Sequence, residues 1–138
     1  MNANEIIHVQ DLHKWFDMLH VLKGVSFVVH EREVLVIIGR SGSGKSTLLR
    51  CINRLIEPTS GKIYWNNQDV TAASTGEIRK IRRQIGMIFQ QFNLVKRSPV
   101  LTNVLAGRLG YISPWRSLIN SFSKQDRERA LSNLDQLG

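Results

Sequence analysis

Cysteine is nearly absent from this chain: Cys51 is the one cysteine in 138 residues, which excludes a disulfide framework. It lies in a stretch predicted to be helical, and we expect a small core side chain rather than a nucleophile. No apolar run approaches membrane-spanning length. Residues 1–5 contain neither a basic segment nor a long apolar one, so no signal peptide is predicted. The expected location is therefore the cytosol.

Acidic residues are missing from a long stretch of the sequence. Between Ile78 and Gln125 there are nine Lys and Arg residues and no Asp or Glu, within a formal net charge of +8. A solvated face, or a chain that lacks an acidic remainder, is the simplest interpretation. A surface that meets anionic lipid headgroups or an acidic partner is the alternative. We predict no nucleic-acid partner, because the sequence has no reading motif or interleaved aromatic stripe.

Residues 34–47 carry the most specific pattern of the chain. Five consecutive apolar residues, 34–38, predict a strand that is buried on both faces. The full phosphate-loop pattern follows, Gly39-x4-Gly44-Lys45-Ser46. The next apolar positions fall on one face of a helix, and they are Leu48, Leu49, Ile52 and Leu55. The loop is thus predicted between the end of a strand and the start of a helix.

The residue types of the loop suit a triphosphate. Glycines at 39, 42 and 44 let backbone N–H groups turn inward with no Cβ in the way, and the helix start adds partial positive charge. Lys45 can reach the β- and γ-phosphates, and the Ser46 hydroxyl can ligate Mg²⁺. Thr47 can add a further phosphate contact. A purely structural Gly/Ser-rich turn is the alternative, and the strand and helix on either side argue against it.

Two strands, at residues 6–16 and 25–29, are predicted to form an antiparallel hairpin around a polar turn at 17–20. Trp15 and Phe16 point to opposite faces of a strand, so we expect one in the core and the other available to an adenine base. Without further context, a core position for both is the alternative. We predict that Trp15 is the core residue.

Further elements follow from local patterns. Residues 62–65 and 68–70 predict a second hairpin around Asn66-Asn67, residues 75–83 a helix with Ile78 and Ile81 inward, and residues 85–89 an apolar strand.

The last third of the chain reads as helical. Ser98 and Pro99 predict the cap and first position of a helix that runs to about Ala106. Ser123 and Asp126 predict the cap of a final helix. One apolar stripe is predicted on a short helix, at Trp115, Leu118, Ile119 and Phe122. The buried face of the final helix is predicted at Leu131, Leu134 and Leu137.

Taken in order, these motifs resemble the N-terminal part of the ATP-binding subunits of ABC transporters. Leu12-x-Lys14-x-Phe16 resembles the A-loop of that family, which implies that Phe16 stacks on adenine with Val21 beside the base. Gln90 falls at the Q-loop glutamine, which implies contacts with Mg²⁺ and the attacking water. The residues predicted to bind ATP are Phe16, Val21, Gly39, Arg40, Ser41, Gly42, Ser43, Gly44, Lys45, Ser46 and Thr47. Those predicted at Mg²⁺ are Ser46 and Gln90.

The resemblance implies an α/β fold: a P-loop NTPase core with an N-terminal antiparallel β-subdomain and the start of a helical subdomain, incomplete as a whole. Three parts are expected within a partial ABC ATPase domain. Residues 1–33 form the antiparallel part, residues 34–98 the Walker A and Q-loop core, and residues 99–138 the start of the helical part.

Two stretches, residues 89–97 and 100–110, resemble the phosphonate importer ATPases, and polar amino acid importers are the alternative. The resemblance implies an ATPase subunit that couples ATP binding and hydrolysis to the uptake of phosphonate or a phosphate-like solute. Its implied partners are a transmembrane permease subunit, a second ATPase subunit and, indirectly, a solute-binding protein. The implied location is peripheral, at the cytoplasmic face of the inner membrane.

Some positions depart from the family pattern. Arg40 stands where proline is usual, which puts an extra charge at the phosphate loop. The signature sequence, the Walker B aspartate, the catalytic glutamate and the switch histidine would all lie beyond residue 138. We therefore expect a chain that cradles nucleotide without the groups that activate water, and whether it is an enzyme stays open. A non-catalytic nucleotide-binding remnant is the alternative, and a P-loop kinase or GTPase fits the hairpin and the Gln90 loop less well.

Overall fold

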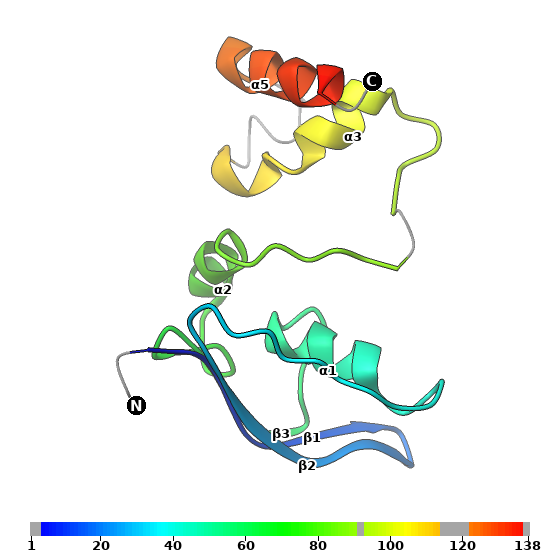
Figure 1. The fold of residues 1–138 in the computed structure, drawn as a ribbon, viewed down its shortest axis with the longest axis vertical. Coiled ribbons are helices and arrows are strands. Elements are labelled where there is room, and N and C mark those ends of the chain that lie inside the picture. Colours follow the sequence, from blue (N-terminus) through cyan, green and yellow to red (C-terminus); the bar gives the residue numbers. More distant parts are fainter. Residues whose placement is uncertain (1–3, 91–92, 114–121, 137–138) are drawn as a thin grey trace. The chain divides into compact units, whose positions relative to one another are not determined.

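The computed structural model describes residues 4–90, 93–113 and 122–136, drawn in colour in Figure 1. The chain divides into two compact units, Met1–Ile85 and Gly86–Gly138. The first unit holds β1 (Glu5–Phe16), β2 (Leu19–His30), α1 (Lys45–Ile52), β3 (Ser60–Trp65), β4 (Gln68–Asp69) and α2 (Thr75–Arg82). The described part of the second unit holds α3 (Val100–Ala106), the 3-10 turn η1 (Leu109–Tyr111) and α5 (Lys124–Asp135).

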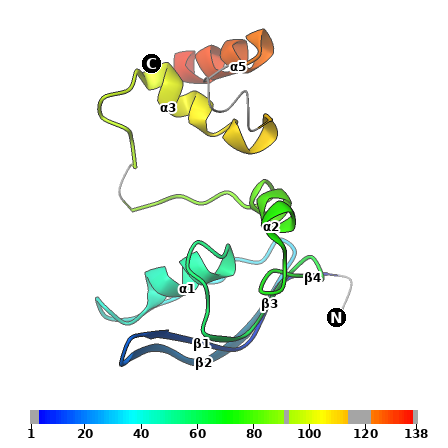
Figure 2. The same ribbon diagram turned by 180° about the vertical axis from the view of Figure 1, so that it is seen from behind.

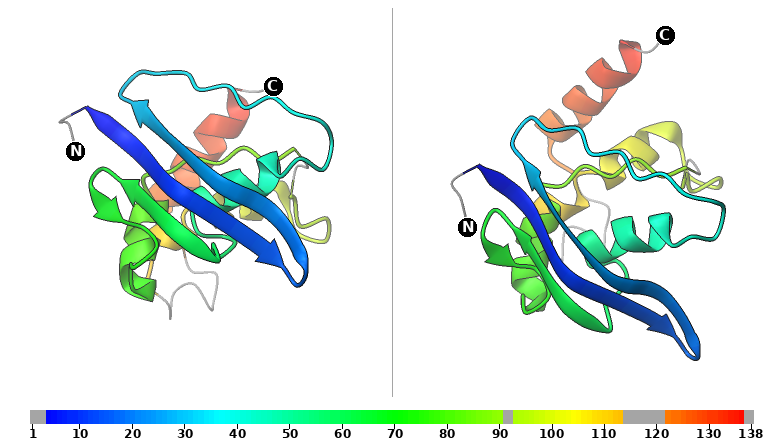
Figure 3. Two further views of the ribbon diagram at one scale, coloured as in Figure 1. Left: turned by 90° about the horizontal axis from the view of Figure 1, so that it is seen from below. Right: turned by 60° about the horizontal axis from the view of Figure 1, so that its bottom comes forward.

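The four strands form one antiparallel sheet in the order β2-β1-β3-β4. Figure 3 shows the long β1–β2 pair with β3 beside it. Both predicted hairpins are confirmed, although β2 begins at Leu19, inside the turn predicted at 17–20. The first turns at Asp17, which has φ 49°, and the second at Asn66 and Asn67, with φ 45° and 63°. Asn and Asp adopt such left-handed conformations at lower cost than most side chains, because their short polar groups bond locally.

One face of the sheet is covered by α1, and the core of the first unit lies between them (Figures 1 and 2). Cys51 is fully buried there, as predicted, and burial raises the pKa of its thiol. The buried core residues are Val9, Leu12, Leu22, Leu48, Cys51, Ile52, Ile63, Val70, Ala73, Ile78 and Ile81. The core thus draws on β1, β2, β3, α1 and α2.

Arginines fasten the end of α1 to the segment that leads into α2. The Arg54 guanidinium donates to the carbonyls of Val70, at 3.2 Å, and of Ala73. Arg82 donates to the carbonyls of Asn53 at 2.9 Å and of Arg54 at 2.6 Å. Carbonyls at a helix C-terminus have no partner within the helix, so these bonds satisfy groups that would otherwise need water.

The prediction of a buried strand at residues 34–38 is wrong for this structure. These residues form no strand, and Val34, Val36 and Ile38 are 87%, 69% and 90% exposed. Only strands β1–β4 pair within the described residues, so the segment has no neighbour to complete its backbone hydrogen bonds. Residues 85–89 likewise form no strand, and Ile88 is 99% exposed.

Two further apolar predictions fail in the first unit. The helix after the loop ends at Ile52, before Leu55, and Leu49 and Leu55 are each 48% exposed. Trp15 is not a core residue: it is 41% exposed, much like Phe16 at 42%. Its ring stacks on His20, with ring centroids 3.9 Å apart. The Trp15 ring is therefore partly covered by His20 instead of being buried in the core.

The helix predicted at 75–83 is confirmed as α2, with Ile78 and Ile81 buried. Ser74 caps it: its side chain accepts from the Glu77 backbone, while the Glu77 carboxylate accepts from the Ser74 backbone at 2.8 Å. This reciprocal arrangement satisfies two orphan donors at the helix start.

The second unit contains α3 and α5 in contact with each other. The predicted Ser98 cap is wrong, because α3 starts at Val100 with Pro99 in the cap position and no side-chain cap bond. Asn103 closes that end of the helix instead. Its amide donates to the carbonyls of Ser98 and Pro99 at 3.2 Å, and its oxygen accepts from the Val95 N–H at 2.8 Å.

The predicted cap of α5 is confirmed, since the Ser123 side chain accepts from the Asp126 N–H. Its buried positions, however, are Asp126 and Ala130, while Leu131 is 48% exposed. Leu137 and the predicted stripe at 115–119 lie outside the described residues, and Phe122 is described but not helical. Among the described helices, none has the length and apolar character needed to cross a membrane.

Candidate nucleotide-binding site

The phosphate-loop residues form a tight turn that leads directly into α1. Gly44 is the N-cap residue, with φ 90°, and the Leu48 N–H donates to its carbonyl at 2.8 Å. A Cβ on Gly44 would lie 3.1 Å from Val21 Cγ1 and 3.2 Å from Leu22 Cδ2. Glycine is required here both by the left-handed backbone and by the close approach of β2. The strand and the loop are therefore in direct contact.

The Lys45 side chain folds back over the loop. Its ammonium donates to the carbonyls of Gly39 and Arg40, both at 2.7 Å, and lies 3.4 Å from Ser43 Oγ. The positive charge is thus held at the centre of the turn by neutral acceptors. A phosphate oxygen would offer the ammonium an acceptor of opposite charge, which adds an attraction between full charges that the neutral carbonyls do not supply.

A hollow of about 220 Å³ opens at this turn. Its lining combines glycines, hydroxyls and the lysine, all from the loop and the first turn of α1, with one residue from β2: Val21, Gly42, Ser43, Gly44, Lys45, Ser46 and Thr47. The fold thus brings Val21 beside the loop, although Val21 and Gly42 are 21 positions apart in the sequence. The other predicted loop residues, Gly39, Arg40 and Ser41, belong to the turn without lining the hollow.

The donors at this hollow fit an anion better than a bare metal ion. The first N–H groups of α1 have no partner within the helix and carry its partial positive charge. Lys45 adds a full charge, and no carboxylate lines the hollow. Ser46 supplies one neutral hydroxyl, and the described residues contain no cluster of three His, Cys, Asp or Glu able to hold a metal. A Mg²⁺ ion here would need most of its ligands from phosphate oxygens and water.

Phe16 lies at the end of β1, and the ammonium of Lys14 stands 4.8 Å from its ring centroid. Lys14 belongs to the sequence motif, but no role was predicted for it. Its spacing from Phe16 could have indicated their contact, because residues two apart in a strand share one face. Phe16 is not among the residues that line the hollow.

Gln90, predicted to share a Mg²⁺ ion with Ser46, belongs to the second unit and is exposed. Its contact with the metal stays a prediction.

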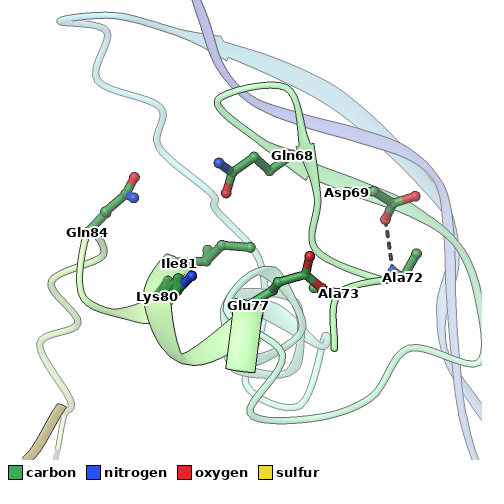
Figure 4. A pocket seen from close by; sticks show the side chains of 8 residues that line it. All are labelled: Gln68, Asp69, Ala72, Ala73, Glu77, Lys80, Ile81 and Gln84. Atoms are coloured by element: carbon green, nitrogen blue, oxygen red, sulfur yellow. Dashed lines mark hydrogen bonds between the residues drawn. The ribbon is translucent and has the colours of Figure 1, made fainter. Parts of the chain in front are cut away.

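A larger hollow, of about 570 Å³, lies between β4 and α2 in the first unit (Figure 4). Its carboxylates already serve local structure. Asp69 accepts from the N–H groups of Thr71 at 2.8 Å and Ala72 at 3.0 Å, and Glu77 belongs to the α2 cap. A bond from the Thr71 hydroxyl, together with the N–H bonds from Ala72 and Thr71, holds the pKa of Asp69 below its usual range. Bonds from the Ser74 hydroxyl and N–H hold the pKa of Glu77 below its usual range. This chemistry explains a turn and a helix cap, so the loop at Lys45 is the stronger candidate site.

A left-handed glycine cap, an inward lysine and hydroxyls at a helix start define a phosphate-loop protein of the α/β class. The sequence profile of the ABC transporter family matches residues 22–138. The chain belongs to the ABC transporter family, and the resemblance inferred from its motifs is confirmed.

Curated relatives carry the name of one importer subunit. The chain is 55% identical over 118 residues to the "Phosphonates import ATP-binding protein PhnC" of Nitratidesulfovibrio vulgaris, covering 86% of this chain and 44% of the relative. It is 48% identical over 138 residues to the protein of the same name from Bdellovibrio bacteriovorus, covering 99% and 53%. The chain therefore spans about half the length of these relatives.

Solved structures support the fold class. The dimeric structure of MJ0796, a bacterial ABC transporter cassette, matches with a TM-score of 0.75 and 34% identity, over 94% of this chain and 56% of the cassette. A nucleotide-free cassette from an ABC transporter matches with a TM-score of 0.72 and 31% identity, over 95% and 53%. The predicted α/β fold with an N-terminal antiparallel sheet and a phosphate loop is confirmed.

Proposed function

We propose that this chain is the nucleotide-holding part of the ATP-binding subunit of an ABC importer for phosphonates or a phosphate-like solute. The observation that carries the proposal is the Lys45 ammonium at the centre of the turn, 2.7 Å from two loop carbonyls and beside the free N–H groups of α1. The solute class rests on the relatives, which are named as phosphonate import proteins.

The triphosphate of ATP would lie at the hollow lined by Gly42 to Thr47. Lys45 would exchange its neutral carbonyl partners for phosphate oxygens, and the helix N–H groups would bind the same anion. The Ser46 hydroxyl would supply one ligand to Mg²⁺, with Gln90 a further one. Phe16 would stack on the adenine, with Val21 beside it.

Hydrolysis needs a group that orients water as well as groups that neutralise charge. The lining of the hollow supplies the second kind and contains no carboxylate for the first. We therefore assign nucleotide binding to the described residues and assign them no hydrolytic step. Coupling to transport would involve a transmembrane permease subunit and a second ATPase subunit. That role would place the protein peripherally at the cytoplasmic face of the membrane.

The test is a titration of the 138-residue chain with a fluorescent ATP analogue, comparing the parent with Lys45→Ala. Loss of charge-assisted bonds worth roughly 1.5–3 kcal/mol should raise the Kd about 10- to 100-fold. Lys124→Ala is the matched control, because it removes a lysine that is 92% exposed on α5. Equal affinity of the parent and Lys45→Ala would refute the assignment.

A further inference from the structure

Lys14, in the β1–β2 hairpin, contacts the ring of Phe16. Lys14 and Phe16 are two residues apart in β1, and the Lys14 ammonium lies 4.8 Å from the Phe16 ring centroid. That distance is within the range of a cation–π interaction. One face of the Phe16 ring is therefore covered by the lysine, while the side chain as a whole remains 42% exposed.

Lys14 also connects this ring to the phosphate-loop side of the sheet. In the β1–β2 register it stands opposite Leu22. Leu22 is 3% exposed, and its Cδ2 lies 3.2 Å from the Cβ position of Gly44. Lys14 thus contacts the Phe16 ring and is paired across the strands with Leu22, which packs beside Gly44 of the phosphate loop.

We propose that Lys14 is a positioning residue for the purine: its ammonium holds one face of Phe16 and leaves the other as the platform for the base. The inference rests on the proposed nucleotide site and deepens it. The ring is negative over its faces, so an ammonium on one side fixes its orientation without occupying the side that stacks. A flexible surface phenylalanine would instead lose rotamer freedom when the base arrives, which weakens binding.

The experiment separates the base from the phosphates. Binding of ATP and of tripolyphosphate to the 138-residue chain is measured by competition against a fluorescent ATP analogue, for the parent, Lys14→Met and Lys14→Arg. We expect Lys14→Met to weaken ATP binding roughly two- to fivefold and to leave tripolyphosphate binding unchanged. Lys14→Arg should keep the parent affinity, because a guanidinium makes the same contact with the ring.

Phe16→Ala supplies the second arm. If Lys14 acts through the ring, Lys14→Met should have no further effect on ATP affinity in the Phe16→Ala background. An equal loss for ATP and tripolyphosphate would identify Lys14 as a phosphate contact and overturn the inference. The inference would also be overturned if Lys14→Met lowered ATP affinity by the same factor in the Phe16→Ala background as in the parent. It would equally be overturned if Lys14→Met did not lower the ATP affinity of the parent.

Folding and the underlying site are checked separately. Should Lys14→Met fail to fold by circular dichroism, Lys14→Gln takes its place with the same expectations. A parent chain that binds ATP no better than Lys45→Ala would overturn the proposed function and this inference together. If ATP binding depends on Lys45 but its affinity is unchanged in Lys14→Met, only the inference about Lys14 is overturned.

Discussion

The guanidinium of Arg108 donates to the carboxylate of Asp126 at 2.7 Å. This bond joins the chain just after α3 to the first turn of α5. The same carboxylate accepts from the Ser123 hydroxyl at 2.7 Å, and Arg108 also lies 4.4 Å from the Tyr111 ring centroid. One acidic side chain therefore organises the contact between the two helices, in a stretch otherwise rich in basic residues.

Acid should loosen this contact. Bonds from Ser123 and Arg108 hold the pKa of Asp126 below its usual range. A lowered carboxyl pKa contributes stability that is present above the unfolded-state value, about 3.9, and is lost as pH falls through the lowered native value. We expect helical circular dichroism to fall in that acidic window. Asp126→Asn should show the loss already at pH 7, and Asp135→Asn, at the other end of α5, should behave as the parent.

Substitution of Gly61, in β3, should be among the most destabilising glycine substitutions in the sheet. It has φ 91°, and a Cβ there would run into the carbonyl of Asp11 on the neighbouring strand. A side chain at such a position costs on the order of 1–3 kcal/mol. Gly61→Ala should therefore lower the urea midpoint clearly.

Gly76, in α2, is the matched control, since nothing lies within 4 Å of its Cβ position. Gly76→Ala should raise stability by roughly 0.5–1 kcal/mol, because alanine favours helix. Equal effects of the two substitutions on urea denaturation would show that the Gly61 contact with Asp11 is not made.

The histidines of the hairpin predict a second pH dependence. His13 Nδ1 and His20 Nε2 are 3.0 Å apart and share one hydrogen bond, while His13 Nε2 lies 3.1 Å from the Asp11 carboxylate. Partial burial lowers the pKa of His20, and the nearby charges of His13 and Lys23 add to this effect. The folded chain therefore binds fewer protons at His20 than the unfolded chain.

Stability should accordingly be highest above the ordinary histidine pKa of about 6.5 and should fall as pH drops from there towards the lowered native value. Thermal unfolding between pH 8 and pH 5 measures this. His20→Gln should flatten the profile, because it removes the group whose pKa is lowered in the folded chain. A parent whose Tm rises on acidification through this range would contradict the assignment.

Local signals predicted this structure better than apolar runs did. The turn at Asn66 and Asn67, the Ser123 cap and the Gly44 turn act through bonds within a few residues, so local sequence signals predicted them. The Ser74 cap is equally local but was not predicted. Trp15 was assigned to the core wrongly, because its environment depends on which side chain lies opposite it across the strands, and that side chain is His20, which stacks on its ring. The β1–β3 pairing was not predicted either, since long-range register depends on the whole sheet.

The candidate site divides in the same way. The turn before α1 could be predicted because its motif is local, and the left-handed backbone of Gly42 and Gly44 agrees with it. The roles of its residues towards ATP stay predictions. The family resemblance implied Val21 beside the base, but neither its contact with the phosphate loop nor the position of Lys14 over Phe16 was predicted. Contacts between β1, β2 and α1 depend on packing that no short sequence pattern encodes.

The exposed segment 34–38 should govern association of the chain. Val34, Val36 and Ile38 are 87%, 69% and 90% exposed, in a segment that forms no helix and lies outside the sheet. Such a segment pairs readily with another copy, and a single charge on it opposes that pairing. We expect Val36→Lys to reduce light scattering at a given protein concentration. Val100→Lys, at an exposed valine that begins α3 and is 67% exposed, should change scattering little, because helical backbone cannot pair as a strand. If both substitutions reduce scattering equally, the added charge alone is the cause, and segment 34–38 does not drive association.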